Sequence, residues 1–137
     1  MNSNNIFVDT NILIGAAVGR VEDRACLHYL YSLEGKNLFI SALSIAQLVA
    51  TIQKKISTAE LKQIVKEYLH RFQIVAFTEA DIIEALERSE TDLEDNIQYV
   101  IGTKVKCKYF ITNNLKDFRR YLAISVKAPK DVRSIKR

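Results

Sequence analysis

NIFVDTNILI, residues 5–14, is the stretch of the chain that decides the fold. Three apolar residues on each side enclose Asp9, Thr10 and Asn11, so both flanks are predicted to be buried. A carboxylate in such a place is costly unless hydrogen-bond donors or a positive charge satisfy it. Asp9 therefore either caps a helix where the chain turns or points into a functional site.

Short apolar segments alternate with amphipathic ones along the rest of the chain. We expect helices and buried strands in alternation, with strands at 5–8, 38–41, 74–77, 109–112 and 124–126 and helices at 11–18, 21–33, 44–54, 58–72, 78–88 and 91–104. Strands that are apolar throughout and separated by helices are typical of a parallel sheet covered on both faces. The predicted fold class is α/β, a three-layer α/β/α sandwich with a central parallel sheet of about four to five strands.

The composition is that of a globular protein, with 137 residues of which 48% are hydrophobic and 26% charged, and we expect one domain over 1–137. The first residues lack the pattern of a signal peptide, and no run approaches the roughly 20 apolar residues of a membrane helix. Cys26 and Cys107 match no metal-binding spacing, which predicts reduced thiols. A cytoplasmic protein without membrane contact is expected.

The net charge of +4 is divided unevenly along the chain. Residues 104–137 hold eleven Lys or Arg against two Asp, whereas residues 1–103 hold nine basic and fourteen acidic side chains. The basic part would attract a polyanion. The acidic run at 79–95 would repel that polyanion unless cations lie between them.

Polar side chains follow two of the predicted strands at their carboxyl ends. Asp9 ends the first strand, and TNNLKDF, residues 112–118, follows the fourth. In open parallel sheets, sites form beyond the carboxyl ends of the strands. Asp9, Asn114 and Asp117 are therefore candidates for one shared site.

A further acidic segment, TDLEDNIQY at residues 91–99, begins a predicted helix between these strands. With Thr91 as the N-cap, Asp92 and Asp95 are three residues apart on one helical face, and Glu94 faces elsewhere. Each acid alone also fits a helix cap or a first-turn acid that favours the helix dipole.

Taken together, these acids favour a cation site over a set of helix caps. Carboxylates that converge in one cleft repel each other, so they require a hard divalent cation with oxygen ligands, of which Mg²⁺ is the natural choice. Such an ion polarises a phosphoryl oxygen and lowers the pKa of an attacking water. The pattern therefore predicts hydrolysis of a phosphodiester.

Four segments together carry a family resemblance: VDTNILI at 8–14, SALSIAQL at 41–48, DLEDNIQY at 92–99 and FITNNLKDF at 110–118. In this order and spacing they resemble the PIN-domain family, above all its small VapC-type toxins, over residues 6–129. The resemblance implies a ribonuclease that depends on Mg²⁺ or Mn²⁺. It also implies RNA as substrate, a cognate antitoxin as partner and a homodimer.

The resemblance also assigns roles by position. Asp9 and Asp95 match catalytic acids that bind metal, and Asp92 matches an extra acid of the "DFEDA"-like subset, with Asp117 as a fourth metal ligand. Supporting residues of the site are Thr10, Asn11, Gln47, Thr112 and Asn114. From the charge pattern, the residues expected to hold the RNA backbone are Lys104, Lys106, Lys108, Lys116, Arg119 and Arg120.

One departure from the family pattern leaves alternatives open. Gln47 stands where the family usually has Glu, and an amide offers an oxygen without a charge. The chain then fits either an active nuclease or a catalytically weakened PIN fold that binds RNA or protein. A DNA nuclease or other phosphoesterase with the same acids is a further alternative. A receiver-type α/β protein is disfavoured because no acid ends the third strand.

Overall fold

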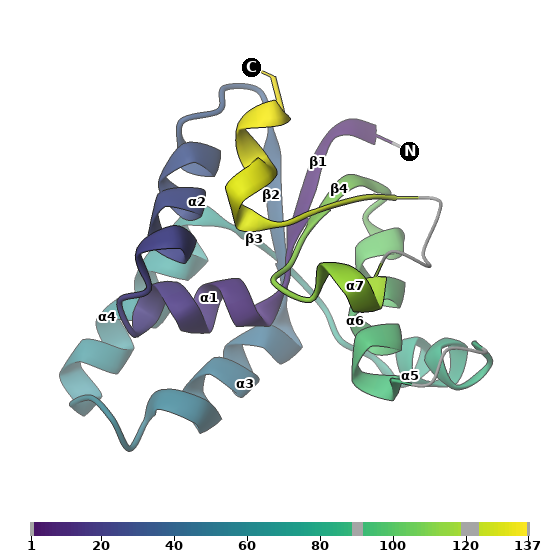
Figure 1. Ribbon diagram of the computed structural model, residues 1–137. Helices are drawn as coiled ribbons and strands as arrows, with labels where there is room; N and C mark the ends of the chain where they lie inside the picture. Colours follow the sequence, from purple (N-terminus) through teal and green to yellow (C-terminus); the bar gives the residue numbers. More distant parts are fainter. Residues whose placement is uncertain (1, 89–91, 119–123, 137) are drawn as a thin grey trace.

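The computed structural model describes residues 2–88, 92–118 and 124–136 and has a five-stranded parallel sheet at its centre (Figure 1). The spatial order is β3-β2-β1-β4-β5, and each neighbouring pair is parallel. The strands are β1 (Asn2–Val8), β2 (Asn37–Ser41), β3 (Gln73–Val75), β4 (Cys107–Ile111) and β5 (Ser125–Lys127). The predicted fold class is confirmed.

Helices cover the sheet on both faces, as Figure 1 shows with α1 to α4 on one side and α5 to α7 on the other. Their bounds are α1 (Thr10–Ala17), α2 (Val21–Tyr31), α3 (Ala42–Ile52), α4 (Thr58–Arg71), α5 (Glu79–Leu86), α6 (Leu93–Lys104) and α7 (Leu115–Phe118), with a 3₁₀ helix η1 at Pro129–Ser134. In the parts of the chain described, none of these helices is long and apolar enough to cross a membrane.

The central strand β1 supplies side chains to both layers of the core. Ile6 and Val8 pack with α1 to α4 and η1, whereas Phe7 packs with Phe110 and residues of α6 on the other face. Phe7 and Phe110 stack with their ring centroids 5.2 Å apart. Alternate residues of a strand face opposite ways, so burial on both faces explains the continuous apolar run before Asp9.

Some boundaries differ from the predicted ones for local reasons. The helix expected to begin at Ser44 begins at Ala42, because Ser41 acts as its cap and accepts a hydrogen bond from the Leu43 N–H at 3.0 Å. Asp92 rather than Thr91 caps α6, and Thr91 lies outside the described residues. The short helices α7 and η1 were not predicted, since four to six residues show no periodicity.

Parallel pairing brings the carboxyl ends of β2, β1 and β4 to one edge of the sheet. Ser41 ends β2, while Asp9 and Thr112 directly follow β1 and β4. Asp9 N donates to the carbonyl of Ile111 at 2.9 Å, which ties the first of these ends to β4. Side chains from distant parts of the sequence therefore meet at this edge.

Lys104 joins the end of α6 to the start of α5. Its Nζ donates to the carbonyl of Ala76 and to Oδ2 of Asp81, each at 2.8 Å. Burial acts to raise the pKa of Asp81, but the hydrogen bond and charge of Lys104, with the Thr78 N–H, bring that pKa below its usual value. Lys104 therefore has a structural role between two helices.

We expect Lys104→Met to lower the free energy of unfolding at neutral pH by about 1 kcal/mol, since the ion pair is partly exposed. Because the pKa of Asp81 is lowered in the folded protein, its ionised carboxylate stabilises the fold at pH values above about 4, the pKa of an Asp in the unfolded chain. This contribution is lost as the pH falls through the lowered pKa. Urea unfolding curves of wild type and variant should therefore converge in acid. Lys62→Met on the exposed surface of α4 is the control, and an equal loss of unfolding free energy in that variant would contradict the structural role of Lys104.

Candidate metal centre

The carboxylate of Asp9 is 6% exposed and is surrounded by hydrogen-bond donors. Oδ1 accepts from the N–H of Thr10 at 2.8 Å and from Nε2 of Gln98 at 3.3 Å. Oδ2 accepts from Oγ1 of Thr112 at 2.8 Å and from Nδ2 of Asn11 at 3.1 Å. Asp9 is thus the N-cap of α1 and at the same time the centre of a polar site.

A second group of polar side chains joins three helices beside Asp9. Oγ1 of Thr10 lies 2.7 Å from Oγ of Ser44, from Oε1 of Gln47 and from Nε2 of Gln98. Nε2 of Gln98 also lies 3.1 Å from Oγ of Ser44. Because Ser44 and Gln98 are buried, this network fixes α1, α3 and α6 relative to one another.

Gln98 and Ser44 have functional positions that the sequence analysis missed. The available signal for Gln98 was its place on a predicted helix three residues before the apolar Ile101, because residues three apart share one face of a helix. A glutamine there requires polar partners, and those partners mark a site. Ser44 carried no comparable signal.

A cleft of about 320 Å³ opens beside Asp9. Its walls come from α1, α3, the first turn of α6 and the segment after β4, and the residues that line it are Asp9, Thr10, Asn11, Ile14, Gln47, Ala50, Thr51, Glu94, Asp95, Gln98 and Asn114. Asp95 is 7% exposed and Glu94 is exposed. The structure therefore brings Asp9 and Asp95 to one cleft.

The expectation that Glu94 faces away from Asp95 is wrong, because both line the cleft. Asp92 is not among the lining residues, and its Oδ1 accepts from the N–H of Asp95 at 3.0 Å. Asp92 is the non-helical cap residue of α6, so the three-residue spacing does not place it on the face of Asp95. Its carboxylate holds the first turn of the helix instead.

The segment after β4 supplies Thr112 and Asn114 to the site. Thr112 is fully buried and donates to Asp9, and Asn114 lies on the wall of the cleft. Lys116 is exposed on α7, two residues beyond Asn114. The side chain of Asp117 and the residues Arg119 and Arg120 lie outside the described part of the chain.

Three lysines predicted to hold RNA lie toward the other end of the sheet. Lys104 ends α6, nine residues or about 14 Å along the helix from Asp95. Lys106 precedes β4 and Lys108 is in its first half, whereas the cleft lies at the carboxyl end of this strand. The structure therefore does not bring these three side chains to the cleft.

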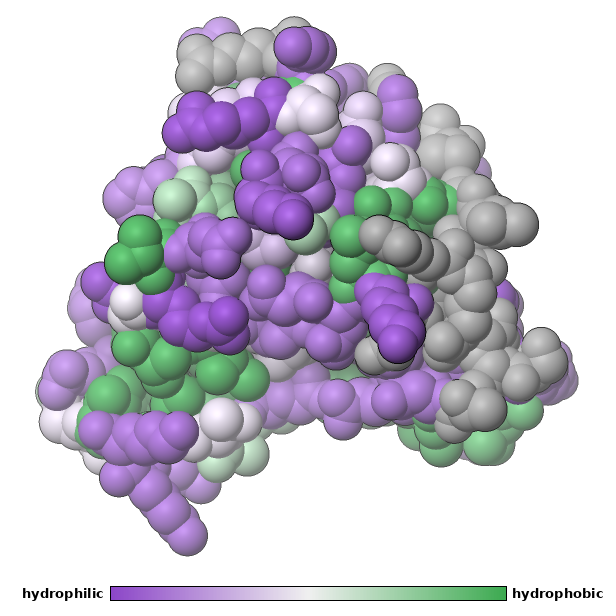
Figure 2. Space-filling model, in the orientation of Figure 1, coloured by the Kyte–Doolittle hydropathy of each residue, from purple (hydrophilic) through white to green (hydrophobic). Residues whose placement is uncertain are grey.

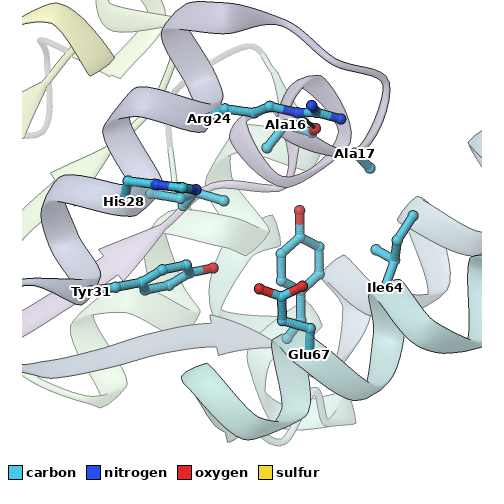
Figure 3. Close-up of a pocket in the computed structure, with 9 residues that line it drawn as sticks. Ala16, Ala17, Arg24, His28, Tyr31, Ile64 and Glu67 are labelled. Carbon is cyan, nitrogen blue, oxygen red and sulfur yellow. Dashed lines mark hydrogen bonds between the residues drawn. The ribbon is translucent and has the colours of Figure 1, made fainter.

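A second hollow, between α1, α2 and α4, has a different chemistry (Figure 3). Arg24, His28, Tyr31 and Glu67 project toward it, and its volume is about 260 Å³. Cationic and anionic side chains are mixed there. The paired acids of the first cleft fit a divalent cation better.

Burial raises the pKa of Asp9 from 3.8 to about 6, although the hydrogen bonds of Thr112, Thr10 and Gln98 oppose this, and the charge of Glu94 adds to the rise. A cation beside Asp9 would offset the cost of its charge. Among the residues described, no three His, Cys, Asp or Glu side chains lie close enough together to hold an ion on their own. Two carboxylates with retained waters are the kind of site that Mg²⁺ occupies, so the residues present fit such an ion.

The raised pKa of Asp9 predicts the pH dependence of stability in metal-free protein. The fold binds the Asp9 proton more tightly than the unfolded chain does, so this contribution is complete below about pH 4 and is lost as the pH rises through about 6. Between these limits, the free energy of unfolding of wild type should fall by about 3 kcal/mol relative to Asp9→Asn. Denaturation curves of both proteins, recorded in EDTA across this pH range, measure the difference in free energy of unfolding. An Asp9 carboxyl that titrates near pH 4 by NMR would contradict the prediction.

Comparisons with known proteins agree with this architecture. Residues 6–122 match the family model of the PIN domain. Ribonuclease VapC1 of Aquifex aeolicus (strain VF5) is 27% identical over 126 residues, which cover 83% of this chain and 84% of that protein.

Solved structures share the fold. VapBC2 from Rickettsia felis, bound to a DNA fragment from its promoter, aligns with a TM-score of 0.71 at 19% identity and covers 90% of this chain and 98% of that chain. A toxin–antitoxin complex from Klebsiella pneumoniae aligns with a TM-score of 0.69 at 22% identity, covering 90% and 97%. Since the family model spans most of the sequence, the chain belongs to the PIN domain family.

Proposed function

We propose that this protein is a metal-dependent endoribonuclease, and that the cleft between Asp9 and Asp95 is its active site. The observation that carries the proposal is a buried carboxylate, that of Asp9, which accepts from four hydrogen-bond donors and lines the same open cleft as a second buried acid, Asp95. The similarity to a protein named as a ribonuclease supports RNA as the substrate.

In this proposal, Asp9 and Asp95 hold Mg²⁺ or Mn²⁺, which would polarise a phosphoryl oxygen and activate water for hydrolysis. Thr112, Asn11, Gln98 and the Thr10 N–H orient the carboxylate of Asp9. Glu94 adds negative charge at the wall of the cleft. Asp92 contributes through the cap that holds the first turn of α6, which carries Asp95, and Asp117 remains a candidate ligand.

We further propose that the chain is the toxin of a toxin–antitoxin pair. Its structural relatives include VapBC complexes from Rickettsia felis and Salmonella typhimurium, which supports an antitoxin protein as partner. A homodimer is also proposed. Figure 2 shows apolar side chains gathered at the lower right, where Figure 1 places α5, and Ile82, Ile83 and Leu86 of that helix are exposed.

We assign the phosphate backbone of RNA to Asn114, on the wall of the cleft, and to Lys116, which is exposed two residues further along the chain, with Arg119 and Arg120 as candidates nearby in sequence. Such contacts set the position of a nucleic acid without reading its sequence. Binding should therefore weaken as salt rises.

The test is cleavage of a mixed RNA pool with Mg²⁺, Mn²⁺ or EDTA. Wild type should cut only with metal, and Asp9→Asn and Asp95→Asn should each reduce the rate by at least about 100-fold, since each removes a charged ligand. Asp131→Asn, at the exposed start of η1, is the control for a lost surface charge. Metal-independent cleavage, or full activity of both variants, contradicts the proposal. Single-stranded and duplex DNA in the same assay separate a ribonuclease from a general phosphodiesterase.

Gln47 favours a second candidate, a PIN fold with weakened catalysis that binds RNA or protein. Its Oε1 accepts from the hydroxyl of Thr10 at 2.7 Å, and its side chain lines the cleft without adding charge. RNA binding that needs no metal, in a protein that does not cut, would support this candidate.

Gln47→Glu should strengthen metal binding, because a carboxylate can keep the hydrogen bond from Thr10 and adds a charge at the cleft. We expect the Mg²⁺ concentration for half-maximal cleavage to fall by about 10-fold. Gln53→Glu, at the end of α3, is the matched control. An unchanged Mg²⁺ requirement in Gln47→Glu would show that position 47 does not contribute to metal affinity.

A further inference from the structure

A second carboxylate, that of Asp23, is fully buried outside the cleft. It lies in the first turn of α2, where the helix dipole favours a negative charge. Its Oδ2 is 3.5 Å from Nε of Arg20, whose side chain is 61% exposed, so this ion pair compensates the charge weakly. Its Oδ1 accepts from Nδ2 of Asn113 at 3.0 Å. Asp23 is not among the residues that line the cleft proposed as the active site.

Gly15 shows that the position of Asp23 is tightly set. A Cβ on Gly15 would lie 1.7 Å from Oδ2 of Asp23, so the carboxylate rests directly against the backbone of α1. Glycine is unfavourable inside a helix, and here this close approach requires it. The same helix begins at Thr10, next to Asp9, so Asp23 bridges the helix of the site and the segment after β4.

Asn113 connects Asp23 to Asn11, because its side chain binds Asp23 and its backbone N–H binds Asn11. The N–H of Asn113 donates to Oδ1 of Asn11 at 3.1 Å, and an amide that accepts on its oxygen presents its NH₂ group on the other side. That NH₂ group donates to Oδ2 of Asp9. The backbone of Asn113 thereby selects the amide orientation in which Asn11 is a donor to Asp9.

Asn114 has a parallel effect on Thr112. The N–H of Asn114 donates to Oγ1 of Thr112 at 3.0 Å, and the hydroxyl in turn donates to the same Oδ2 of Asp9 at 2.8 Å. Two consecutive N–H groups of one short segment therefore direct two donors to one oxygen. The orientation of that segment decides how Asp9 is held.

We infer that Asp23 is a positioning residue of the site: by binding Asn113 it fixes the 112–114 segment, which directs Asn11 and Thr112 to Oδ2 of Asp9. The inference rests on the proposed function only in taking Asp9 as the metal ligand. The arrangement itself exists without metal and is testable without it. Residues that orient a ligand in this way typically change metal affinity by about 10- to 100-fold when removed.

The first measurement is the NMR resonance of the Asn11 side-chain amide in metal-free protein. Asp23→Ala and the surface variant Asn113→Ala should both shift this resonance, and Asp23→Ala should also speed hydrogen exchange of the Asn113 N–H. Both variants should weaken Mn²⁺ binding, measured by EPR, by about 10-fold, and reduce kcat more than they change KM. Asp23→Asn keeps an oxygen that can accept from Asn113, and should recover Mn²⁺ affinity to within about 3-fold of wild type.

Asp81→Ala is the matched control, because it removes another buried carboxylate, at the start of α5. It should lower the thermal midpoint without moving the Asn11 resonance. A cycle of Asp23→Ala with Asn113→Ala adds a second test: if Asp23 acts through Asn113, the double variant binds Mn²⁺ as weakly as either single variant, whereas independent effects add.

Failure of this inference is distinct from failure of the proposed function. If wild type neither binds Mn²⁺ nor cuts RNA, the proposed function falls, while the Asn11 resonance still decides the role of Asp23. An Asn11 resonance that is unchanged in both Asp23→Ala and Asn113→Ala overturns the inference. Should Asp23→Ala fail to fold, the resonance in Asn113→Ala, which alters an exposed residue, is sufficient to support or overturn it.

Discussion

The buried charge of Asp9 is the constraint on which the rest of the site depends. A carboxylate at the end of a strand enclosed on both faces needs donors, and these come from α1, α6 and the segment after β4. Each donor must in turn be directed, which accounts for the polar network of Thr10, Ser44 and Gln98 inside an otherwise apolar layer. Polar groups in such a place are costly unless the whole network is satisfied, so the site and the core between these helices are stabilised together.

The sequence predicted the alternation of strands and helices well, because each segment carries its own periodicity. It also predicted that Asp9 and Asn114 share one site, since parallel strands bring their carboxyl ends together. Asp95, at the start of a helix, was assigned to the same site from the group of acids and from the family resemblance. Asp92 and Glu94 were assigned the wrong way round relative to the cleft, because the choice of cap residue shifts the helix start and the cap itself is not helical. Ser44 and Asp23 could not be assigned to the site from spacing, since the side chains that link them to it, those of Thr10, Gln98 and Asn113, are 34 to 90 residues away in the chain.

Few of the acidic side chains in the segment that leads to this cleft contribute charge to it. Of the eight acids between Glu79 and Asp95, Asp81 pairs with Lys104 and Asp92 caps a helix, while Glu94 and Asp95 line the cleft. An amide at position 47 keeps the hydrogen bond to Thr10 and leaves out a negative charge. In the proposed metal site, this small number of carboxylates would hold a divalent ion less tightly than a larger number would, and occupancy would then depend on the free ion concentration.

The two outer strands of the sheet, β3 and β5, each have three residues. An unpaired strand edge is a template on which another chain can add as a further strand, and short edges are one way in which proteins avoid this. Here an incoming strand would find few backbone groups to pair with at either side. Association of this protein with a copy of itself should therefore use side chains on the helices, and overproduction should favour discrete complexes over extended β aggregates.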